Sequence, residues 1–294
     1  MHAHETSHRR GILSMLFAVA MFCLMDACMK VLTPHYPPMQ IAALRGLTSL
    51  PLVAIWTLLH GGAGQLVRVR WALHLLRGAL SVLMLAAFAF GLKTLPMAEA
   101  YSLFFVAPLL ITALAVPILG EHVGWRRWSA IAVGFAGTVI VLRPTGAGML
   151  SAGGLAVIAA AAGYALSALI VRVLGRSDST QSMVFWMLAM VSVFATALAW
   201  PQWIALRAAD TPVLIALAIS GALGQWGITE AFRRTPASIL APLEYTALVW
   251  GIGLDWMLWH TLPDRTMLLG AAVIVVAGLY LLRRERGAGA TKSA

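Results

Sequence analysis

Long apolar runs separated by short polar turns follow one another along the whole chain. An α-helix rises 1.5 Å per residue, so about 20 apolar residues cross the hydrocarbon core of a bilayer. Ten runs approach this length, and the breaks between them fall at prolines, glycines and charged residues. The pattern therefore predicts an all-α integral membrane protein with ten transmembrane helices, over residues 11–33, 38–60, 72–94, 96–118, 126–143, 152–174, 182–200, 211–232, 236–260 and 264–283.

The apolar pattern also repeats within the chain. Residues 93–144 resemble residues 233–285, and an offset of 140 residues pairs Pro96 with Pro236, Leu103 with Leu243, Ala107 with Ala247 and Leu114 with Leu254. Each half contains five predicted spans, an odd number, so the second half enters the membrane in the opposite orientation. Two inverted five-helix repeats around a pseudo-twofold axis are typical of secondary transporters. The predicted divisions are a tail (1–10), a first repeat (11–144), a periplasmic linker (145–151), a second repeat (152–284) and a second tail (285–294).

The composition excludes a water-soluble globule, because 61% of the residues are hydrophobic, 11% are charged and the mean hydropathy is +0.85. A net charge of +10 in a soluble protein would favour nucleic acid, but these charges lie at the ends of apolar runs. Fourteen Lys and Arg residues fall on the side of the N-terminus and four on the other. We predict a multi-pass protein of the cytoplasmic (inner) membrane with both termini cytoplasmic, a lipid bilayer as its surroundings and no nucleic-acid partner.

Motifs for catalysis or for cofactor binding are missing from the sequence. It contains no His-Glu-x-x-His, no Gly-x-Ser-x-Gly and no nucleotide-binding glycine loop. Cys23 and Cys28 are five residues apart, point to different faces of one helix, and support neither a disulfide nor a metal site. We therefore predict a carrier of a small-molecule substrate, with no enzymatic activity, no cofactor and no metal. An intramembrane enzyme and a channel or scaffold subunit are the alternatives.

Charged residues at membrane depth are costly and indicate functional sites. Asp26 and Arg45 are predicted at matching heights, roughly 6 Å to the outer side of the midplane. Lys30 lies one turn from Asp26 on the same helix face, so the three are expected to form a charge cluster. Two interpretations stay open. In the first, the cluster is a structural ion pair that joins two spans. In the second, Arg45 or Lys30 holds a substrate carboxylate while Asp26 holds an amine or a proton.

Glu244 is the deepest of the remaining acidic residues and follows Pro242. Proline frees a backbone carbonyl, which a membrane helix tolerates where it lines a wet cavity. We predict that Glu244 binds a cationic group or titrates during coupling; the alternative is that Arg77 neutralises it. Further residues of the predicted substrate site are Tyr245, Gln225, Trp226, Tyr101, Phe104, Tyr164 and Arg77.

Small residues predict where helices pack closely. Gly134-x-x-Gly137 and the run from Ala159 to Gly163 allow backbones to approach one another. The contact lies either within the chain or with a second protomer, so a monomer and a homodimer are both compatible with the sequence.

One group of motifs resembles a known family. The features are the Leu95-Pro96-x-Ala98-x-Ala100-Tyr101 start, Ala107-Pro108-Leu109, the Gly120-Glu121 turn, Arg126-Arg127-Trp128, Gly134-Phe135-x-Gly137 and Arg143-Pro144. Together they resemble the first EamA repeat of the drug/metabolite transporter superfamily. Asp26 with Lys30, and His74-x-x-Arg77-Gly78, are similar to the branch that includes bacterial S-adenosylmethionine uptake carriers.

The resemblance implies a ten-span carrier whose fourth and ninth spans line the substrate path. It further implies a small metabolite as substrate, such as an amino acid or a cationic amino-acid derivative. The second copy departs from the family pattern, because His260-Thr261 stands where Gly-Glu is expected. The role of Glu121 in its turn is therefore not duplicated.

Overall fold

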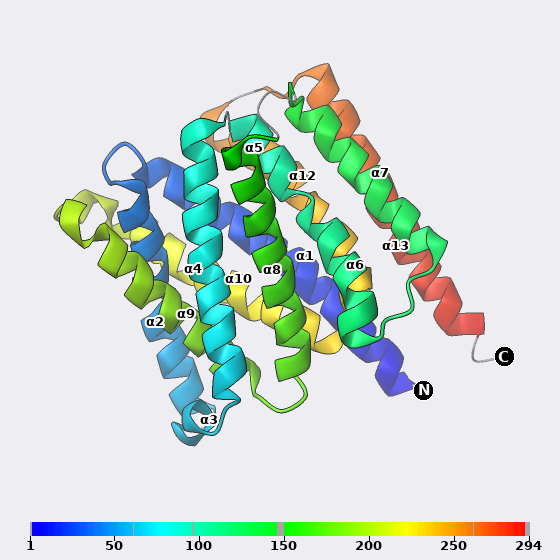
Figure 1. Cartoon of the computed structure of the whole chain (residues 1–294), viewed down its shortest axis with the longest axis horizontal. Coiled ribbons are helices and arrows are strands. Elements are labelled where there is room, and N and C mark those ends of the chain that lie inside the picture. The colour runs from blue at the N-terminus through cyan, green and yellow to red at the C-terminus, as the bar shows by residue number, and fades with distance from the viewer. Residues whose placement is uncertain (1, 61, 96, 146–149, 261, 292–294) are drawn as a thin grey trace.

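The computed structural model describes residues 2–60, 62–95, 97–145, 150–260 and 262–291, and every regular element in these ranges is a helix (Figure 1). The longer helices are α1 (His2–Leu32), α2 (Pro38–Leu59), α4 (Trp71–Thr94), α7 (Trp125–Leu142), α8 (Ala152–Leu174), α9 (Thr180–Ala199), α10 (Thr211–Arg234) and α13 (Arg265–Thr291). The shorter ones are α3 (Gly64–Val67), α5 (Met97–Phe104), α6 (Ala107–Leu119), η1 (Trp200–Gln202), η2 (Ala208–Asp210), α11 (Ala237–Leu240), η3 (Ala241–Tyr245) and α12 (Thr246–Trp259).

Eight helical segments of the described chain are long and apolar enough to cross a membrane, which is the pattern of a multi-pass membrane protein. They correspond to eight of the ten predicted spans. The other two predicted spans are less clear-cut. The helix α7 has Arg126 and Arg127 in its first turn, and for α13 the apolar stretch among residues whose side chains are described runs over Arg265–Tyr280.

Both chain ends are more helical than the sequence suggested. The helix α1 begins at His2, within the predicted tail 1–10, and α13 continues to Thr291. Thr235 Oγ1 donates a hydrogen bond to the carbonyl oxygen of His8 at 3.3 Å, so the start of α1 docks on the end of α10. Residues 1, 146–149 and 292–294, which belong to the predicted tails and linker, lie outside the described ranges.

The helices pack in pairs that are distant in sequence. The helix α1 lies against α10, α4 against α8, α2 against α9, and α7 against α13 (Figure 1). Glycines allow the closest approaches, since a Cβ on Gly270 would lie 2.8 Å from the carbonyl oxygen of Gly137 and one on Gly134 would lie 2.5 Å from the ring of Tyr245. The tight contacts predicted for Gly134 and Gly137 are therefore confirmed, and they lie within the chain.

The main buried core lies at the start of the interrupted segment formed by α11, η3 and α12. Side chains of α1, α6, α8, α9 and α10 surround it, and Ala237 to Leu243 are all buried there. Backbone that is not α-helical is tolerated at membrane depth where other parts of the protein surround it. This core therefore fixes the backbone that leads to Glu244.

Candidate functional site

Two spans are interrupted at corresponding places. Span nine consists of the four-residue helix α11, the 3₁₀ helix η3 and α12, while span four breaks between α5 and α6 at Phe105 and Val106. Pro242 lies inside η3 and Pro108 is the second residue of α6, so a residue that lacks a backbone N–H lies at or beside each break. The interruption in span nine carries Glu244 near its end.

Glu244 is half-buried, and its carboxylate accepts a hydrogen bond from the hydroxyl of Tyr164 on α8 at 3.0 Å. The ring of Tyr164 packs against Phe104 at the end of α5, with ring centroids 5.9 Å apart. The structure thus brings together three residues that the sequence placed in one site. Tyr245, the next residue, is fully buried, and its hydroxyl donates to the carbonyl oxygen of Phe105 at 3.3 Å.

Phe88 of α4 was not predicted as a site residue, yet it links two that were. Its ring packs edge-on to Tyr101 at 5.5 Å and to Phe104 at 5.3 Å. An aromatic wall therefore runs from Tyr101 through Phe88 and Phe104 to Tyr164. Nothing in the sequence distinguishes Phe88 from the other apolar residues of its span.

Arg77 does not neutralise Glu244, so that alternative is wrong for this structure. The guanidinium is buried, and it donates to Ser167 Oγ at 3.3 Å and to the carbonyl oxygen of Met183 at 3.1 Å. No ion pair joins Arg77 to an acidic side chain within the part of the chain that the structure describes. Arg77 interacts electrostatically with Tyr164, the same residue that donates to Glu244.

The predicted three-residue charge cluster is wrong with respect to Lys30. Its ammonium pairs with Asp255 of α12 at 2.6 Å and lies 3.9 Å from the centroid of the Trp259 ring. The physical reason is that α12 packs against α1 and supplies a carboxylate at the height of Lys30. A partner that lies 225 residues away in the chain leaves no local signal.

Asp26 and Arg45 remain close neighbours without forming an ion pair among the described residues. The carboxylate of Asp26 interacts electrostatically with Arg45 and also with Tyr101. The guanidinium of Arg45 lies 5.6 Å from the centroid of the Phe22 ring. The side chains of Asp26 and Tyr101 are both exposed, so the described part of the protein leaves two of these three neighbouring groups uncovered.

The two predicted site residues of α10 lie on its buried side. Gln225 is 5% exposed, and the ring of Trp226 lies edge-on to Phe17 of α1 with centroids 6.3 Å apart. The structure thus places Trp226 at the contact between α1 and α10.

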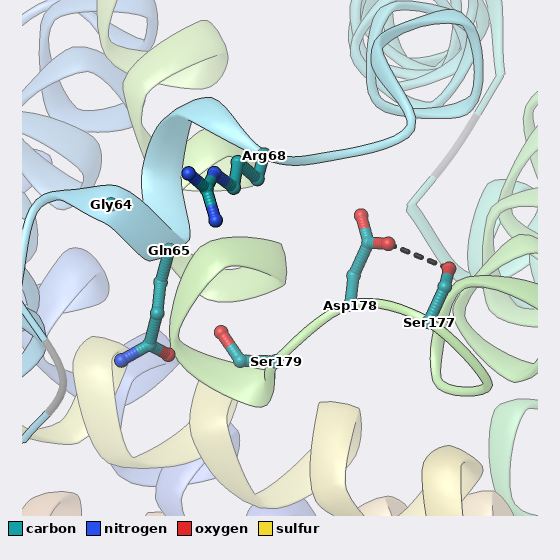
Figure 2. A pocket seen from close by; sticks show the side chains of 6 residues that line it. All are labelled: Gly64, Gln65, Arg68, Ser177, Asp178 and Ser179. Atoms are coloured by element: carbon teal, nitrogen blue, oxygen red, sulfur yellow. Dashed lines mark hydrogen bonds between the residues drawn. The ribbon is translucent and has the colours of Figure 1, made fainter.

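A pocket of about 550 Å³ lies elsewhere, where α3 meets the loop between α8 and α9 (Figure 2). Asp178 in this loop accepts hydrogen bonds from Ser177 Oγ at 2.7 Å and from the backbone N–H of Arg70 at 3.2 Å, and it contacts His74 Nε2 at 2.9 Å. Burial alone would raise the pKa of Asp178, but these partners outweigh it and hold that pKa below its usual range. The residues that line the pocket are Gly64, Gln65, Arg68, Ser177, Asp178 and Ser179, none of them a predicted site residue.

Comparison with known proteins identifies the class of molecule. The sequence matches the EamA-like transporter family twice, over residues 9–143 and 151–284. The chain belongs to this family. The transporter is 25% identical to the pseudopaline exporter CntI of Pseudomonas aeruginosa (strain PAO1), over 95% of this chain and 98% of that protein.

Other relatives of this EamA transporter have other substrates in their names. It is 26% identical to the S-adenosylmethionine uptake transporter of Rickettsia prowazekii, over 97% of both chains. It is 27% identical to the riboflavin transporter of Vibrio cholerae, over 94% of both chains. One solved crystal structure superposes with a TM-score of 0.79 over 93% of this transporter and 96% of that chain, at 19% identity, which shows a common fold alone.

Proposed function

We propose that this protein is a secondary transporter that moves a small metabolite across the cytoplasmic membrane by alternating access. In this proposal ten spans form two inverted repeats, residues 11–144 and 152–284, and both termini are cytoplasmic. The helix pairs support the arrangement. When each span is replaced by the span at the same position in the other repeat, the pair α1–α10 is converted into the pair α8–α4. The pairs α2–α9 and α7–α13 are unchanged by this replacement. Such exchange is what a pseudo-twofold axis in the membrane plane requires.

Backbone conformation at equivalent positions adds independent support for the repeat. Gly120, which ends α6, has φ 68°, and His260, which ends α12, has φ 52°. These two residues are 140 positions apart, the offset that relates the two halves. A left-handed residue is common at a helix C-terminus, but histidine adopts it at a steric cost. Its occurrence at this position is explained if the two turns share one ancestral geometry.

The observation that carries the function is the half-buried Glu244 on an interrupted span, hydrogen-bonded to Tyr164. A carboxylate at membrane depth is retained when it meets a cation, a proton or a hydrogen-bond donor. Asp26 and Glu244 suit an amine or sulfonium group, and Arg45 suits a carboxylate. The aromatic wall of Phe104 and Tyr164 suits a planar or cationic moiety.

We infer an amino acid or a cationic amino-acid derivative such as S-adenosylmethionine as the substrate. The similarity to an S-adenosylmethionine uptake transporter supports this class. Glu244 and Asp26 are the groups that would couple transport, by exchanging a proton or one substrate cation for another. Import, export and exchange all use the same alternation between outward-open and inward-open states.

Counterflow in proteoliposomes tests the proposal. Purified protein is reconstituted, loaded with unlabelled S-adenosylmethionine and assayed for saturable accumulation of the labelled compound. We expect Glu244→Gln to abolish accumulation and Tyr164→Phe to reduce it, with both variants keeping the melting temperature of the parent. Normal accumulation by Glu244→Gln would remove that residue from the site. A non-saturable ion current would favour the channel alternative instead.

Topology is tested separately in intact cells. Single cysteines replace Arg10 and Ser151 in a variant that lacks Cys23 and Cys28, and a membrane-impermeant maleimide is applied from outside. The proposal requires that the cysteine at position 151 reacts in intact cells and that the one at position 10 reacts only after permeabilisation. Reaction of both in intact cells would exclude the ten-span inverted arrangement.

A further inference from the structure

The turn after α6 holds the beginning of the interrupted span nine. Glu121 follows Gly120, the left-handed residue that ends α6. Its carboxylate accepts hydrogen bonds from the backbone N–H of Ala237 at 2.8 Å and from the backbone N–H of Ser238 at 3.1 Å. The hydroxyl of Ser238 donates a third hydrogen bond to it at 2.6 Å. The side chain thus connects span four to the first residues of α11.

These bonds satisfy groups that have no partner within α11. The first turn of a helix leaves its N–H groups without intrahelical acceptors, and α11 is only four residues long. An isolated turn of this length is not stable in itself. The residues of α11 are buried, so water is a poor substitute for the carboxylate. A charged acceptor that receives three donors is the strongest kind of cap available here.

The anchored segment leads directly to the transport site. Only Ala241, Pro242 and Leu243 separate α11 from Glu244, and all three are buried, Ala241 and Leu243 within the main core. A shift at the start of α11 is therefore transmitted through tightly packed backbone, which deforms little by itself. Arg127 Nη1 also donates to Ser238 Oγ at 3.1 Å, so a second side chain holds the same end.

The sequence does not repeat this carboxylate. At the equivalent turn after α12, His260-Thr261 stands in place of Gly120-Glu121, so the residue equivalent to Glu121 is a threonine. This difference between the two turns accompanies a difference in the site. Glu244 in the second repeat occupies the position that Phe104 occupies in the first. Glu244 therefore lies in the same interrupted span whose first residues are bound by Glu121.

We propose that Glu121 is a positioning residue that fixes α11 and thereby sets the place of the Glu244 carboxylate against Tyr164. The inference rests on the proposed function, since it assigns Glu121 a role at that same site. Glu121→Gln keeps the size of the side chain. The glutamine amide nitrogen is itself a donor, however, and it cannot accept a hydrogen bond from the backbone N–H that it faces. The expected result is an increase in the KM for S-adenosylmethionine on the order of tenfold, with Vmax changed less than KM.

Asp264 supplies a matched control. Its carboxylate accepts a hydrogen bond from the backbone N–H of Met267 at 2.8 Å near the start of α13, and it pairs with Arg143 at 2.5 Å. It is therefore also a helix cap with a cationic neighbour, on an exposed end of the bundle. We expect Asp264→Asn to leave KM unchanged. A fall in melting temperature without a change in KM for Glu121→Gln would reduce Glu121 to a structural cap and overturn the proposal.

A measurement that needs no substrate keeps the test decisive. The rate at which dicyclohexylcarbodiimide modifies Glu244, followed by mass spectrometry, reports the surroundings of that carboxyl directly. We expect Glu121→Gln and the milder Ser238→Ala to change this rate, and Asp264→Asn to leave it unaltered. Unchanged rates in the first two variants would overturn the proposal. Normal counterflow by Glu244→Gln is a different result, because it would contradict the proposed function. The effect of Glu121→Gln on the rate of Glu244 modification is measured without transport and tests the positioning role separately.

Discussion

Tyr245 donates a hydrogen bond to the backbone carbonyl of Phe105, the residue 140 positions earlier, across a distance of 3.3 Å. Their ring centroids are 6.1 Å apart. The separation equals the offset between the two halves of the sequence, so the two residues are equivalents. Atoms related by a twofold rotation touch one another only beside the rotation axis. The contact therefore supports an axis that passes between the interruptions of spans four and nine.

The same offset relates Phe104 to Glu244, and both contact Tyr164. In the proposed inverted arrangement, the site thus has a carboxylate on one side of the axis and an aromatic ring on the other. Duplication accounts for the shared backbone interruption, and divergence accounts for the difference in side chain. A substrate with one cationic and one apolar part would meet chemically distinct surfaces in the two repeats.

Gly134 should not tolerate even a methyl group. A Cβ at this position would lie 2.5 Å from Cδ2 of Tyr245, a residue that is fully buried and cannot move aside. We expect Gly134→Ala to destabilise the protein by about 1–3 kcal/mol through overpacking, as measured by thermal unfolding in detergent. Gly251 of α12 is the control, because a Cβ there meets nothing within 4 Å. Gly251→Ala should leave stability equal or raised, and equal behaviour of the two variants would contradict the packing assigned to Tyr245.

Much of the fold follows from local sequence pattern. The apolar runs predicted α2, α4, α7 and α8 within a residue or two, because lipid leaves a helix few alternatives. Proline identified the neighbourhood of both interruptions, and the structure brings Glu244 and Phe104 into contact with Tyr164, although their role as a site stays a prediction. These successes need only periodicity and depth.

The failures concern partners that are far apart in the chain. Lys30 was assigned to Asp26, one turn away, but Asp255 of a packed neighbour lies closer. Glu121 was recognised as a motif without a role, because its donors belong to a helix that begins 116 residues later. Helix pairing decides these contacts, and periodicity within one span contains no information about which spans pair.

The carboxylates of Asp26 on α1 and Asp255 on α12 should behave differently when they are replaced. Lys30 and Asp255 have side chains that are 53% and 48% exposed, and exposed ion pairs contribute about 0–1 kcal/mol. Asp255→Asn is therefore expected to change melting temperature little and counterflow less than about twofold. Asp26 lies near Arg45 without an ion-pair partner in the described structure, so it is available to a solute. Asp26→Asn should lower counterflow on the order of tenfold. Equal transport by the two variants would assign Asp26 to packing.

Asp178 should make a pH-dependent contribution to stability. It is 5% exposed, and its partners Ser177, His74 and the N–H of Arg70 hold its pKa below the unfolded value of about 3.9. A depressed pKa in the folded state means that the stabilisation is fully present above the unfolded pKa and is lost as pH falls through the folded pKa. Asp178→Asn should therefore lower the unfolding free energy by about 1–3 kcal/mol at pH 7.

The difference between the parent and Asp178→Asn should decrease as the pH is lowered below about 3.9. Thermal unfolding in detergent between pH 7 and pH 3 measures it. Ser177→Ala is the control, since it removes one donor at 2.7 Å but leaves the carboxylate and its contact with His74. Its effect should be smaller than that of Asp178→Asn at pH 7. If the difference for Asp178→Asn stayed constant down to pH 3, the ionised carboxylate would not be what joins the loop after α8 to the start of α4.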